Sequence, residues 1–579
     1  MSFLDVGSSI TGRRWIGPEL EVQRAADAMA QSTALPGPLC QVLARRGVAA
    51  ADAEAFLTPQ IRDLLPDPRG LKDMQKAASR FLKAVSKRER IAIFADYDVD
   101  GGSSAALLIV WLRQMGQSAT LYVPDRIDEG YGPNDAAMVE LAATHEVIIC
   151  VDCGTLSHGP IAAAKGADVI VLDHHLSGET LPTALAVVNP NRQDESGELA
   201  YLCAAAVVFL MLVEAGRQLR LADAEGPDLM SLLDLVALAT VADVAPLIGA
   251  NRAFVVQGLK VMAQRARPGL VALSDVARMD SAPTTYHLGF LLGPRVNAGG
   301  RIGQADLGAR LLSSADEHET LAIAERLDLL NSERREIEAA VRAAALEQAN
   351  ERGFDAPLVW AAGEGWHPGV VGIVAARLKE ASNRPAVVIG LEDGIGKGSG
   401  RSVSGVDLGA SIQRLASEGL LVKGGGHKMA AGLTVEQDKL SVAMARLSEL
   451  LEKQGAGAAG PADLRLDGIL MPAAASVQLI EQIERAGPYG AGAPGPRYVF
   501  ADVQIGFAKR VGENHLKISF GDGLGARIDA IAFGAYDTAL GDALEHHGGA
   551  RFHLAGRLET NTWRGKQSAQ LRLEDAAPA

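Results

Sequence analysis

The sequence is poor in several features that would assign a protein to a broad class. Four cysteines among 579 residues are too few for a disulfide framework. The best apolar run, 105–112, is far shorter than the roughly 20 residues that a membrane span needs. The first residues contain no apolar signal core, and no repeat of about 20–50 residues is visible. We therefore expect a soluble, cytoplasmic protein that makes no contact with a membrane.

Basic residues are also in deficit. Lys and Arg number 56 against 70 Asp and Glu, which gives a net charge of −14. Because neutralisation of phosphates dominates affinity for nucleic acids, DNA-binding proteins usually present a basic surface. The charge balance therefore argues against a protein that simply coats DNA. It does not exclude a local basic groove, and a metal site itself requires acidic residues.

Two of the cysteines form a CxxC pair, Cys150 and Cys153. No second pair is present to complete a zinc site, and the residues between them include Asp152 at the expected end of a strand. We interpret the pair as buried thiols that flank a functional aspartate, in preference to a redox or zinc site.

The pattern of apolar runs predicts an α/β protein. The composition, 48% hydrophobic and 22% charged, is that of ordinary globular cores. Between about residues 71 and 270, short β-type runs alternate with helical segments, which indicates a parallel sheet covered on both faces. A second α/β unit follows, with strands near 357–362 and 386–392. The β-type runs of the first unit are 91–95, 119–123, 147–151, 169–172 and 186–188.

Other segments complete the predicted organisation. Residues 316–352 contain no Gly or Pro and carry an apolar stripe, which predicts a long connecting helix. The stretch 455–463 is a flexible linker, and about five short strands after it fit a small barrel such as an OB-fold. The predicted parts are a helical N-terminal extension of open role (1–70), a catalytic parallel-sheet domain (71–310), a connecting helix (311–354), a second α/β domain (355–455) and a β-barrel (462–579).

Acidic residues and histidines follow three of the first β-type runs, where the strands should end. One more acid follows an apolar helical segment further along the chain. Because ligands bind beyond the carboxyl ends of parallel strands, we expect these side chains to converge. The candidates are Asp96, Asp98, Asp100, Asp152, Asp173, His174, His175 and Asp243.

Such a cluster predicts a metal site. Carboxylates packed together repel each other unless a cation lies between them, and carboxylate with imidazole suits divalent ions of the Mn, Mg or Zn type. Two such ions about 3.5–4 Å apart form the usual clamp for phosphoester displacement. We expect Asp98 or Asp152 to bridge them. For any single Asp, a helix N-cap or turn is the alternative; Asp96 could stay solvated, and His175 could face the substrate.

Glycine-rich and basic motifs lie further along the chain. In 424–432, three glycines would let the backbone approach a ligand near His427, and a following helix would offer amide donors to an anion. A structural turn is the alternative. In 396–402, small residues, Ser399 among them, stand beside Lys397 and Arg401 and suit close approach of a phosphate, with a plain loop as the alternative.

Two more motifs have possible ligand roles. Residues 293–303 predict a tight glycine loop in which Arg295, Asn297 and Arg301 capture an anion. Trp366 precedes a predicted helix, where it could stack on a base or belong to the core.

The motifs DYDVDG (96–101), VDCG (151–154), DHH (173–175) and TVADVAP (240–246) resemble the metal motifs of DHH phosphoesterases. GGGHKMAAG (424–432) resembles the signature of the DHH-associated second domain. Three further stretches resemble RecJ single-stranded-DNA exonucleases, and the resemblance covers roughly residues 70–579. These three stretches are GPRVNAGGRIG (293–303), GWHPGVVGIVAARL (365–378) and PYGAGAPGPRYVF (488–500). One departure from the family is Ala95, where the first metal motif often has Gly.

The resemblance implies a 5′-to-3′ exonuclease that hydrolyses single-stranded DNA with two divalent ions, Mn or Mg, in recombination and repair. His175 is implied as a catalytic residue near the metals, and Asp96 as a further candidate ligand. The implied metal ligands are Asp98, Asp100, Asp152, His174 and Asp243. The implied contacts to DNA phosphates are Arg295, Asn297, Arg301, Ser399, Arg401 and His427.

Single-stranded DNA is the expected partner, a single-strand-binding protein and a helicase are candidate protein partners, and a monomer is expected. A cleft between the two α/β domains would admit one strand only, and the barrel would add a stacking platform. One alternative is a DHH phosphodiesterase acting on short oligonucleotides or cyclic dinucleotides, which usually lacks the barrel. The other is a non-catalytic single-strand binding protein, in which metal-binding acids would be lost.

Overall fold

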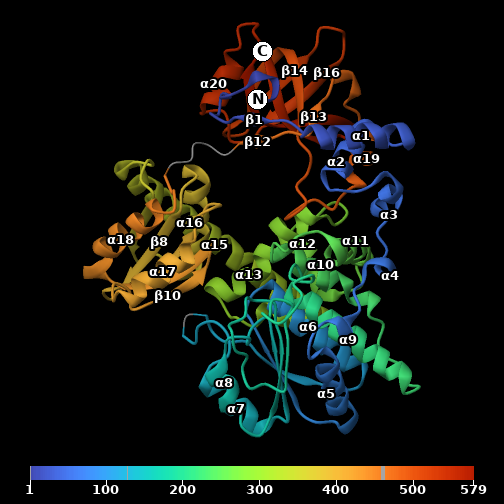
Figure 1. Cartoon of the computed structure of the whole chain (residues 1–579), viewed down its shortest axis with the longest axis vertical. Coiled ribbons are helices and arrows are strands. Elements are labelled where there is room, and N and C mark those ends of the chain that lie inside the picture. The colour runs from blue at the N-terminus through green and yellow to red at the C-terminus, as the bar shows by residue number, and fades with distance from the viewer. Residues whose placement is uncertain (1, 127, 458–462) are drawn as a thin grey trace. The chain divides into compact units, whose positions relative to one another are not determined.

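The computed structural model describes residues 2–126, 128–457 and 463–579. The chain forms two compact units (Figure 1). One consists of Gln60–Ala459 with Gly490–Gly492, and the other of Met1–Pro59, Gly460–Tyr489 and Ala493–Ala579. Among the described residues, no helix is both long enough and apolar enough to cross a membrane.

A five-stranded parallel sheet forms the first part of the larger unit, in the order β3-β2-β4-β5-β6. Strands β2 and β4 are buried throughout, which explains their unbroken apolar sequences. The predicted parallel sheet is thereby confirmed. Its strands are Ile91–Ala95 (β2), Ala119–Tyr122 (β3), Val147–Val151 (β4), Asp168–Leu172 (β5) and Ala186–Val188 (β6).

Helices cover both faces of this sheet. Helices α7 and α8 pack on one face against the alternate strand residues that include Phe94, Ile148 and Val171. Helices α5, α6 and α9 contact strands from the other face, and Figure 1 shows α7 and α8 on the opposite side of the sheet from α5 and α9. The bounds are Met74–Lys87 (α5), Val99–Gln114 (α6), Asp135–Thr144 (α7), His158–Ala163 (α8) and Ala204–Leu221 (α9).

A helical region continues the chain beyond the sheet. Its last member, α15, has 36 residues, and the Asp316 side chain caps it by accepting from the amides of His318 and Glu319. The predicted long helix over 316–352 is therefore confirmed. The helices are Leu233–Ala242 (α10), Gly249–Ala263 (α11), Pro268–Val276 (α12), the π-helical turn His287–Leu292 (η5), Gly293–Ile302 (α13), Leu307–Ser313 (α14) and Glu317–Arg352 (α15).

A second five-stranded sheet, in the order β10-β11-β9-β8-β7, follows α15. Only β7 and β8 pair in parallel; the other pairs are antiparallel. Its strands are Val359–Glu364 (β7), Ala386–Glu392 (β8), Ile395–Arg401 (β9), Lys423–His427 (β10) and Ala430–Glu436 (β11). Its helices are Pro368–Ser382 (α16), Leu408–Ser417 (α17) and Leu440–Glu452 (α18).

The smaller unit is built around a closed barrel. Five strands form it, because β14 pairs with both β15 and β17, and α20 (Ala539–Glu545) lies between β16 and β17 in the chain. This arrangement confirms the predicted OB-fold. The barrel strands are Tyr498–Val511 (β14), His515–Gly521 (β15), Arg527–Ala532 (β16), Arg551–Trp563 (β17) and Lys566–Pro578 (β18).

The first residues of the chain belong to the same unit as the barrel. Strand β1 (Trp15–Ile16) pairs in parallel with β12 (Leu464–Arg465). The fully buried Trp15 donates from Nε1 to Asp575 Oδ2 at 2.9 Å. Helices α1 (Leu20–Ser32) and α2 (Gly37–Arg45) form a further core cluster in this unit. The N-terminal segment is thus mainly helical, and its Trp15 packs with Val499, Ala555 and Ala577 in a cluster separate from the barrel's interior.

Candidate metal centre and surrounding cationic groups

The loop after β2 delivers the first acids. Asp98 is the N-cap of α6, where its Oδ1 accepts from the amides of Asp100 at 2.8 Å and Gly101 at 3.0 Å. A Cβ at Gly101 would lie 2.4 Å from the carbonyl oxygen of Asp96, so the loop can fold back over the helix only at a glycine. The N-cap alternative for Asp98 is therefore correct, but Asp98 also offers a ligand atom within 4.8 Å of ligand atoms of Asp96 and Asp152.

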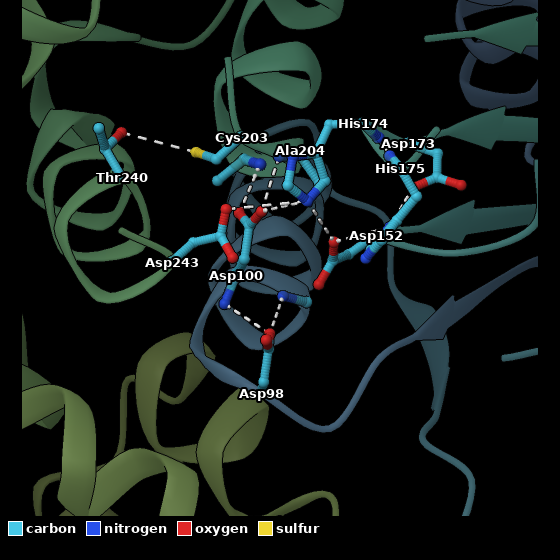
Figure 2. A network of polar contacts seen from close by, with 12 residues as sticks. Asp98, Asp100, Asp152, Asp173, His174, His175, Cys203, Ala204, Thr240 and Asp243 are labelled. Atoms are coloured by element: carbon cyan, nitrogen blue, oxygen red, sulfur yellow. Dashed lines mark hydrogen bonds and ion pairs between the residues drawn. The ribbon is translucent and has the colours of Figure 1, made fainter. Parts of the chain in front are cut away.

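His174, which follows β5, lies at the centre of the acidic residues (Figure 2). Its Nε2 is 3.3 Å from Asp152 Oδ1, 3.7 Å from Asp100 Oδ2 and 3.8 Å from Asp243 Oδ2. These acids come from the loop after β4, the first turn of α6 and the C-terminal end of α10. The structure therefore brings together the side chains that the strand ends predicted. Three overlapping groups have potential ligand atoms within 4.8 Å of each other: Asp152, His174 and His175; Asp100, His174 and Asp243; and Asp96, Asp98 and Asp152.

These carboxyl groups are in unfavourable surroundings without a cation. Burial and then the charge of Asp98 raise the pKa of both Asp96 and Asp152 well above the usual range. Burial and then the charge of Asp100 raise the pKa of Asp243 to about 8. Among the described residues, Asp96 Oδ1 and Asp152 Oδ1 are buried without a hydrogen-bond partner; the contact from Asp152 to His174 lacks hydrogen-bond geometry. Orphaned oxygens and repelling carboxylates with an imidazole fit a divalent cation.

Asp100 is held in place from two sides. Its carboxylate accepts from the amides of Ala204 at 2.7 Å and Ala205 at 2.8 Å, at the N-terminus of α9. The N-terminus of a helix favours negative charge. The Oδ2 atom of Asp100 also faces His174. Beside it, Cys203 Sγ contacts Thr240 Oγ1 at 3.5 Å and so links α9 to α10 (Figure 2).

The cysteines behave as the sequence predicted. All four thiols are free and buried; burial raises the pKa of Cys150 to about 12 and that of Cys153 well above its ordinary value. Both therefore stay neutral on either side of Asp152, which confirms their interpretation as buried thiols.

Asp173 orients His175, a function that sequence reasoning missed. Its Oδ1 accepts from His175 Nδ1 at 2.8 Å, and its Oδ2 accepts from the amide of Thr155 at 3.0 Å. The His175 side chain remains 45% exposed, with the Tyr131 hydroxyl 3.1 Å from its Nδ1. Burial lowers the pKa of His175, but the hydrogen bond and charge of Asp173 outweigh it and raise this pKa to about 9. The position of Asp173 directly after β5 was a usable signal.

A group of partly buried cations lies near the acid loop. Arg301 Nη1 donates to the carbonyl of Gly369 at 3.0 Å and so joins α13 to α16. Burial and then repulsion by Arg126 lower the pKa of Arg301 to about 10, and the same causes lower that of Arg401. Arg126 lies 5.2 Å from the centre of the Tyr97 ring. Mutually repelling guanidinium groups favour an anion between them. Arg126 was missed because no motif surrounds it.

Strand register aligns two motifs of the second sheet. Arg401 pairs with Ala430, which pairs with His427. Opposed residues in antiparallel strands share a face, so Arg401 and His427 lie on one face, together with Ser399 two residues before Arg401. The predicted helix after the 424–426 glycines is wrong, because these glycines lie in β10 and the chain continues into β11. The plain loop considered as the alternative for 396–402 is also wrong, because residues 396–401 lie in strand β9.

The glycines of these strands serve mainly for packing. A Cβ at Gly398 would lie 2.7 Å from Ile389 Cγ1, and one at Gly400 would lie 2.7 Å from Leu408 Cδ2. In β10, a Cβ at Gly424 would lie 2.7 Å from Ile412 Cγ2. A Cβ added at Gly425 would have none of the described atoms within 4 Å. Glycines on the core side let the sheet pack closely, and Gly425 leaves the face with Arg401 open.

The predicted glycine loop over 293–303 is also wrong, because these residues form helix α13. Its glycines allow close helix packing: a Cβ at Gly300 would lie 2.8 Å from the Tyr97 carbonyl oxygen. Asn297 Oδ1 accepts from the Val99 amide at 3.1 Å. Arg295 pairs with Asp328 of α15 at 2.8 Å. In this structure both side chains therefore support the acid loop and the helices, and sequence alone could not show these partners.

Trp366 is half-buried against the core between α15, β7 and α16. A Cβ at Gly363 would lie 2.2 Å from its Cε2, so the ring rests directly on the backbone of β7. These contacts favour the core interpretation of Trp366 over a base-stacking function.

A sheet edge carrying clustered carboxylates and a histidine, next to a second domain with partly buried cations, defines a metal-dependent phosphoesterase of the DHH class. Residues 90–240 match the DHH family N-terminal domain, residues 355–453 match the DHHA1 domain, and residues 466–575 match the RecJ OB domain. The chain belongs to the RecJ family, as its similarity to characterised members shows.

Two such relatives are named single-stranded-DNA-specific exonuclease RecJ. The chain is 37% identical over 567 residues to that of Dickeya dadantii, covering 94% of this chain and 96% of the relative. It is 36% identical over 582 residues to that of Escherichia coli, covering 96% and 98%. The crystal structure of RecJ in complex with Mn²⁺ from Thermus thermophilus matches with a TM-score of 0.80 at 27% identity, covering 97% of this chain and 79% of that one.

Proposed function

We propose that this chain is a metal-dependent exodeoxyribonuclease that degrades single-stranded DNA from 5′ to 3′, in DNA recombination and repair. The observation that carries the proposal is the convergence of acids from separate elements around His174. Relatives named single-stranded-DNA-specific exonucleases support the substrate. Structures of Thermus RecJ in complex with Mn²⁺ and with Mg²⁺ support two divalent ions, Mn or Mg, as cofactors.

Proposed ligands follow from the three groups around His174. Asp152 belongs to two of them, so of the two candidates for a bridging carboxylate, Asp98 and Asp152, we favour Asp152. Bound divalent ions supply Lewis acidity and lower the pKa of water. The proposed ligands are Asp98, Asp100, Asp152, His174 and Asp243, with Asp96 as a further candidate.

The other residues would bind and orient the strand. Asp173 accepts from His175 Nδ1 and so fixes the partly exposed imidazole beside the metal ligands, a place from which it can contact the substrate. We propose phosphate contacts by Arg301, Ser399, Arg401 and His427, and we add Arg126 because its charge acts on both Arg301 and Arg401. Contacts of Arg295 and Asn297 with DNA stay predictions.

Several finer points belong to the same proposal. The DHH domain would span 71–310, the connecting helix 311–354, the DHH-associated domain 355–455 and the OB-fold 462–579, after the extension 1–70. Single-stranded DNA is the proposed substrate. We also propose a cytoplasmic location, a monomeric state, and a single-strand-binding protein and a helicase as partners.

The test compares wild type with Asp152→Ala on a 5′-labelled single strand in Mn²⁺. Wild type should release mononucleotides from the 5′ end, lose activity in EDTA and spare a blunt duplex, and the variant should be inactive. Activity confined to linear or cyclic dinucleotides would favour the small-substrate phosphodiesterase. Binding of the strand without hydrolysis would favour the non-catalytic binding protein.

A further inference from the structure

Val244, directly after Asp243, has a backbone conformation that valine rarely adopts. Helix α10 ends here in a Schellman motif, in which the Val244 amide donates to Val241 at 3.2 Å and the Ala245 amide donates to Thr240 at 3.1 Å. Val244 has φ of 60°, at the position that glycine usually occupies. A β-branched residue is strained there. Because its side chain is 69% exposed, burial within the protein does not compensate for the strain.

Two exposed aromatic rings lie on a segment packed against the same end of α10. Tyr286 and Phe290 are 62% and 72% exposed, and their rings stack with centres 5.4 Å apart at 26°. Their segment is seated on α10: a Cβ at Gly289 would lie 3.4 Å from Val241 Cγ1, and one at Gly293 would lie 3.2 Å from Ala242 Cβ. Exposed apolar side chains therefore flank the helix end that carries Asp243.

We infer that Val244, Tyr286 and Phe290 form an apolar surface that contacts the bases of the strand beside the metal centre. This inference rests on the proposed function. A phosphodiester held near Asp243 must place its neighbouring nucleotide next to the helix end, and aromatic faces stack on unpaired bases without reading their sequence. The partly buried arginines are suited to phosphates, and this uncharged surface is suited to bases. On this inference, the strain at Val244 is tolerated because a glycine would lack the side chain that contacts the bases.

The test substitutes Val244→Gly in the full chain. Because glycine accepts φ of 60°, the melting temperature should rise by about 1–2 °C, and the rise in melting temperature on adding Mn²⁺ should stay as in wild type. The KM for a single-stranded oligonucleotide should increase about five- to tenfold. The KM for an abasic strand of equal length should not change. Phe290→Ala should raise the same KM without a change in melting temperature.

Asp223→Gly is the matched control. Helix α9 ends in the same motif, with the Asp223 amide donating to Arg220 at 3.2 Å, the Ala224 amide donating to Leu219 at 2.9 Å, and φ of 53° at Asp223. At about 1.5 Å per residue, this end lies roughly 27 Å from the end of α9 that holds Asp100. The rise in melting temperature of Asp223→Gly should be equal to or smaller than that of Val244→Gly, and its KM for the single strand should stay unchanged.

The outcomes separate the inference from the proposed function. A lower melting temperature for Val244→Gly would contradict the claim that Val244 is strained. An unchanged KM would contradict the claim that the surface contacts bases, and would leave the surface for a protein partner. Equal loss on normal and abasic strands would show that Val244 acts on the backbone or on Asp243, which also overturns it. A wild-type protein that cannot degrade single strands would instead overturn the proposed function.

Discussion

Asp152 is buried beside like charges, so the same side chain that would hold a cation destabilises the metal-free protein. Asp152→Asn removes one charge and keeps the shape. We expect the melting temperature without metal to rise by about 1–3 °C, the stabilisation by Mn²⁺ to shrink, and nuclease activity to fall by about 1,000-fold or more. Calorimetry with and without Mn²⁺, together with a nuclease assay, measures all three. A metal-free variant less stable than wild type would contradict the repulsion.

Asp173 accepts from the His175 imidazole and from the His174 amide, but its own carboxylate belongs to none of the groups of candidate ligands. Its removal should therefore affect mainly the orientation of the His175 imidazole. Asp173→Asn should reduce kcat by about 10–100-fold, because the Nδ1 donor loses its charged acceptor. Asp168→Asn is the control at the opposite end of β5, where Asp168 pairs with Arg80 at 2.5 Å. It should reduce stability and leave kcat unchanged. Equal losses of kcat in the two variants would show that Asp173 only stabilises the fold and does not orient His175.

At the scale of elements, helix α13 sets the position of the acid loop. Gly300→Ala would place a Cβ 2.8 Å from the Tyr97 carbonyl oxygen, so the loop bearing Asp96 and Asp98 must move. A displacement of about 1 Å can cost about 100-fold in rate, and we expect a loss of that size with weaker binding of Mn²⁺. Single-turnover rates across a Mn²⁺ titration measure both effects.

Gly216→Ala provides the comparison for that helix substitution. Gly216 lies within α9, where the nearest atom to an added Cβ is the flexible Arg220 Nη1 at 3.5 Å. Alanine should stabilise this helix by up to about 1 kcal/mol and leave the kinetics unchanged. If Gly300→Ala behaved in the same way, the packing of α13 on Tyr97 would not position the acids.

At the scale of the whole molecule, the N-terminal segment up to Pro59 belongs to the barrel's unit and not to the metal-binding unit. Trp15 is fully buried and donates to the buried Asp575. Trp15→Ala should lower the free energy of unfolding of that unit by about 3–5 kcal/mol. Hydrogen exchange in 498–578 measures the loss, and stabilisation of the metal-binding unit by Mn²⁺ should persist.

Trp563→Ala tests whether a large loss is specific to the core. Trp563 is 70% exposed at the end of β17, so its removal should change stability by less than about 0.5 kcal/mol. If Trp15→Ala left exchange in the barrel unchanged, β1 would be dispensable for it.

The sequence by itself determined the parallel sheet, the long helix, the barrel and the candidate metal cluster. Unbroken apolar runs identify buried strands, and residues that follow such strands must meet at one edge of a parallel sheet. Asp98, Asp152 and His174 were therefore predictable as neighbours although they lie far apart in the chain.

Only the tertiary structure decided what the glycines and arginines do. Glycine permits a loop, a strand against a crowded core and a close helix contact alike. The segment 293–303 was therefore predicted as a loop but forms α13, and most of 396–402, for which a plain loop was the alternative, forms β9. The partner of Arg295 and the proximity of Arg126 to Arg301 depend on packing between distant segments. Local periodicity does not encode such packing, because it arises only when the elements are assembled.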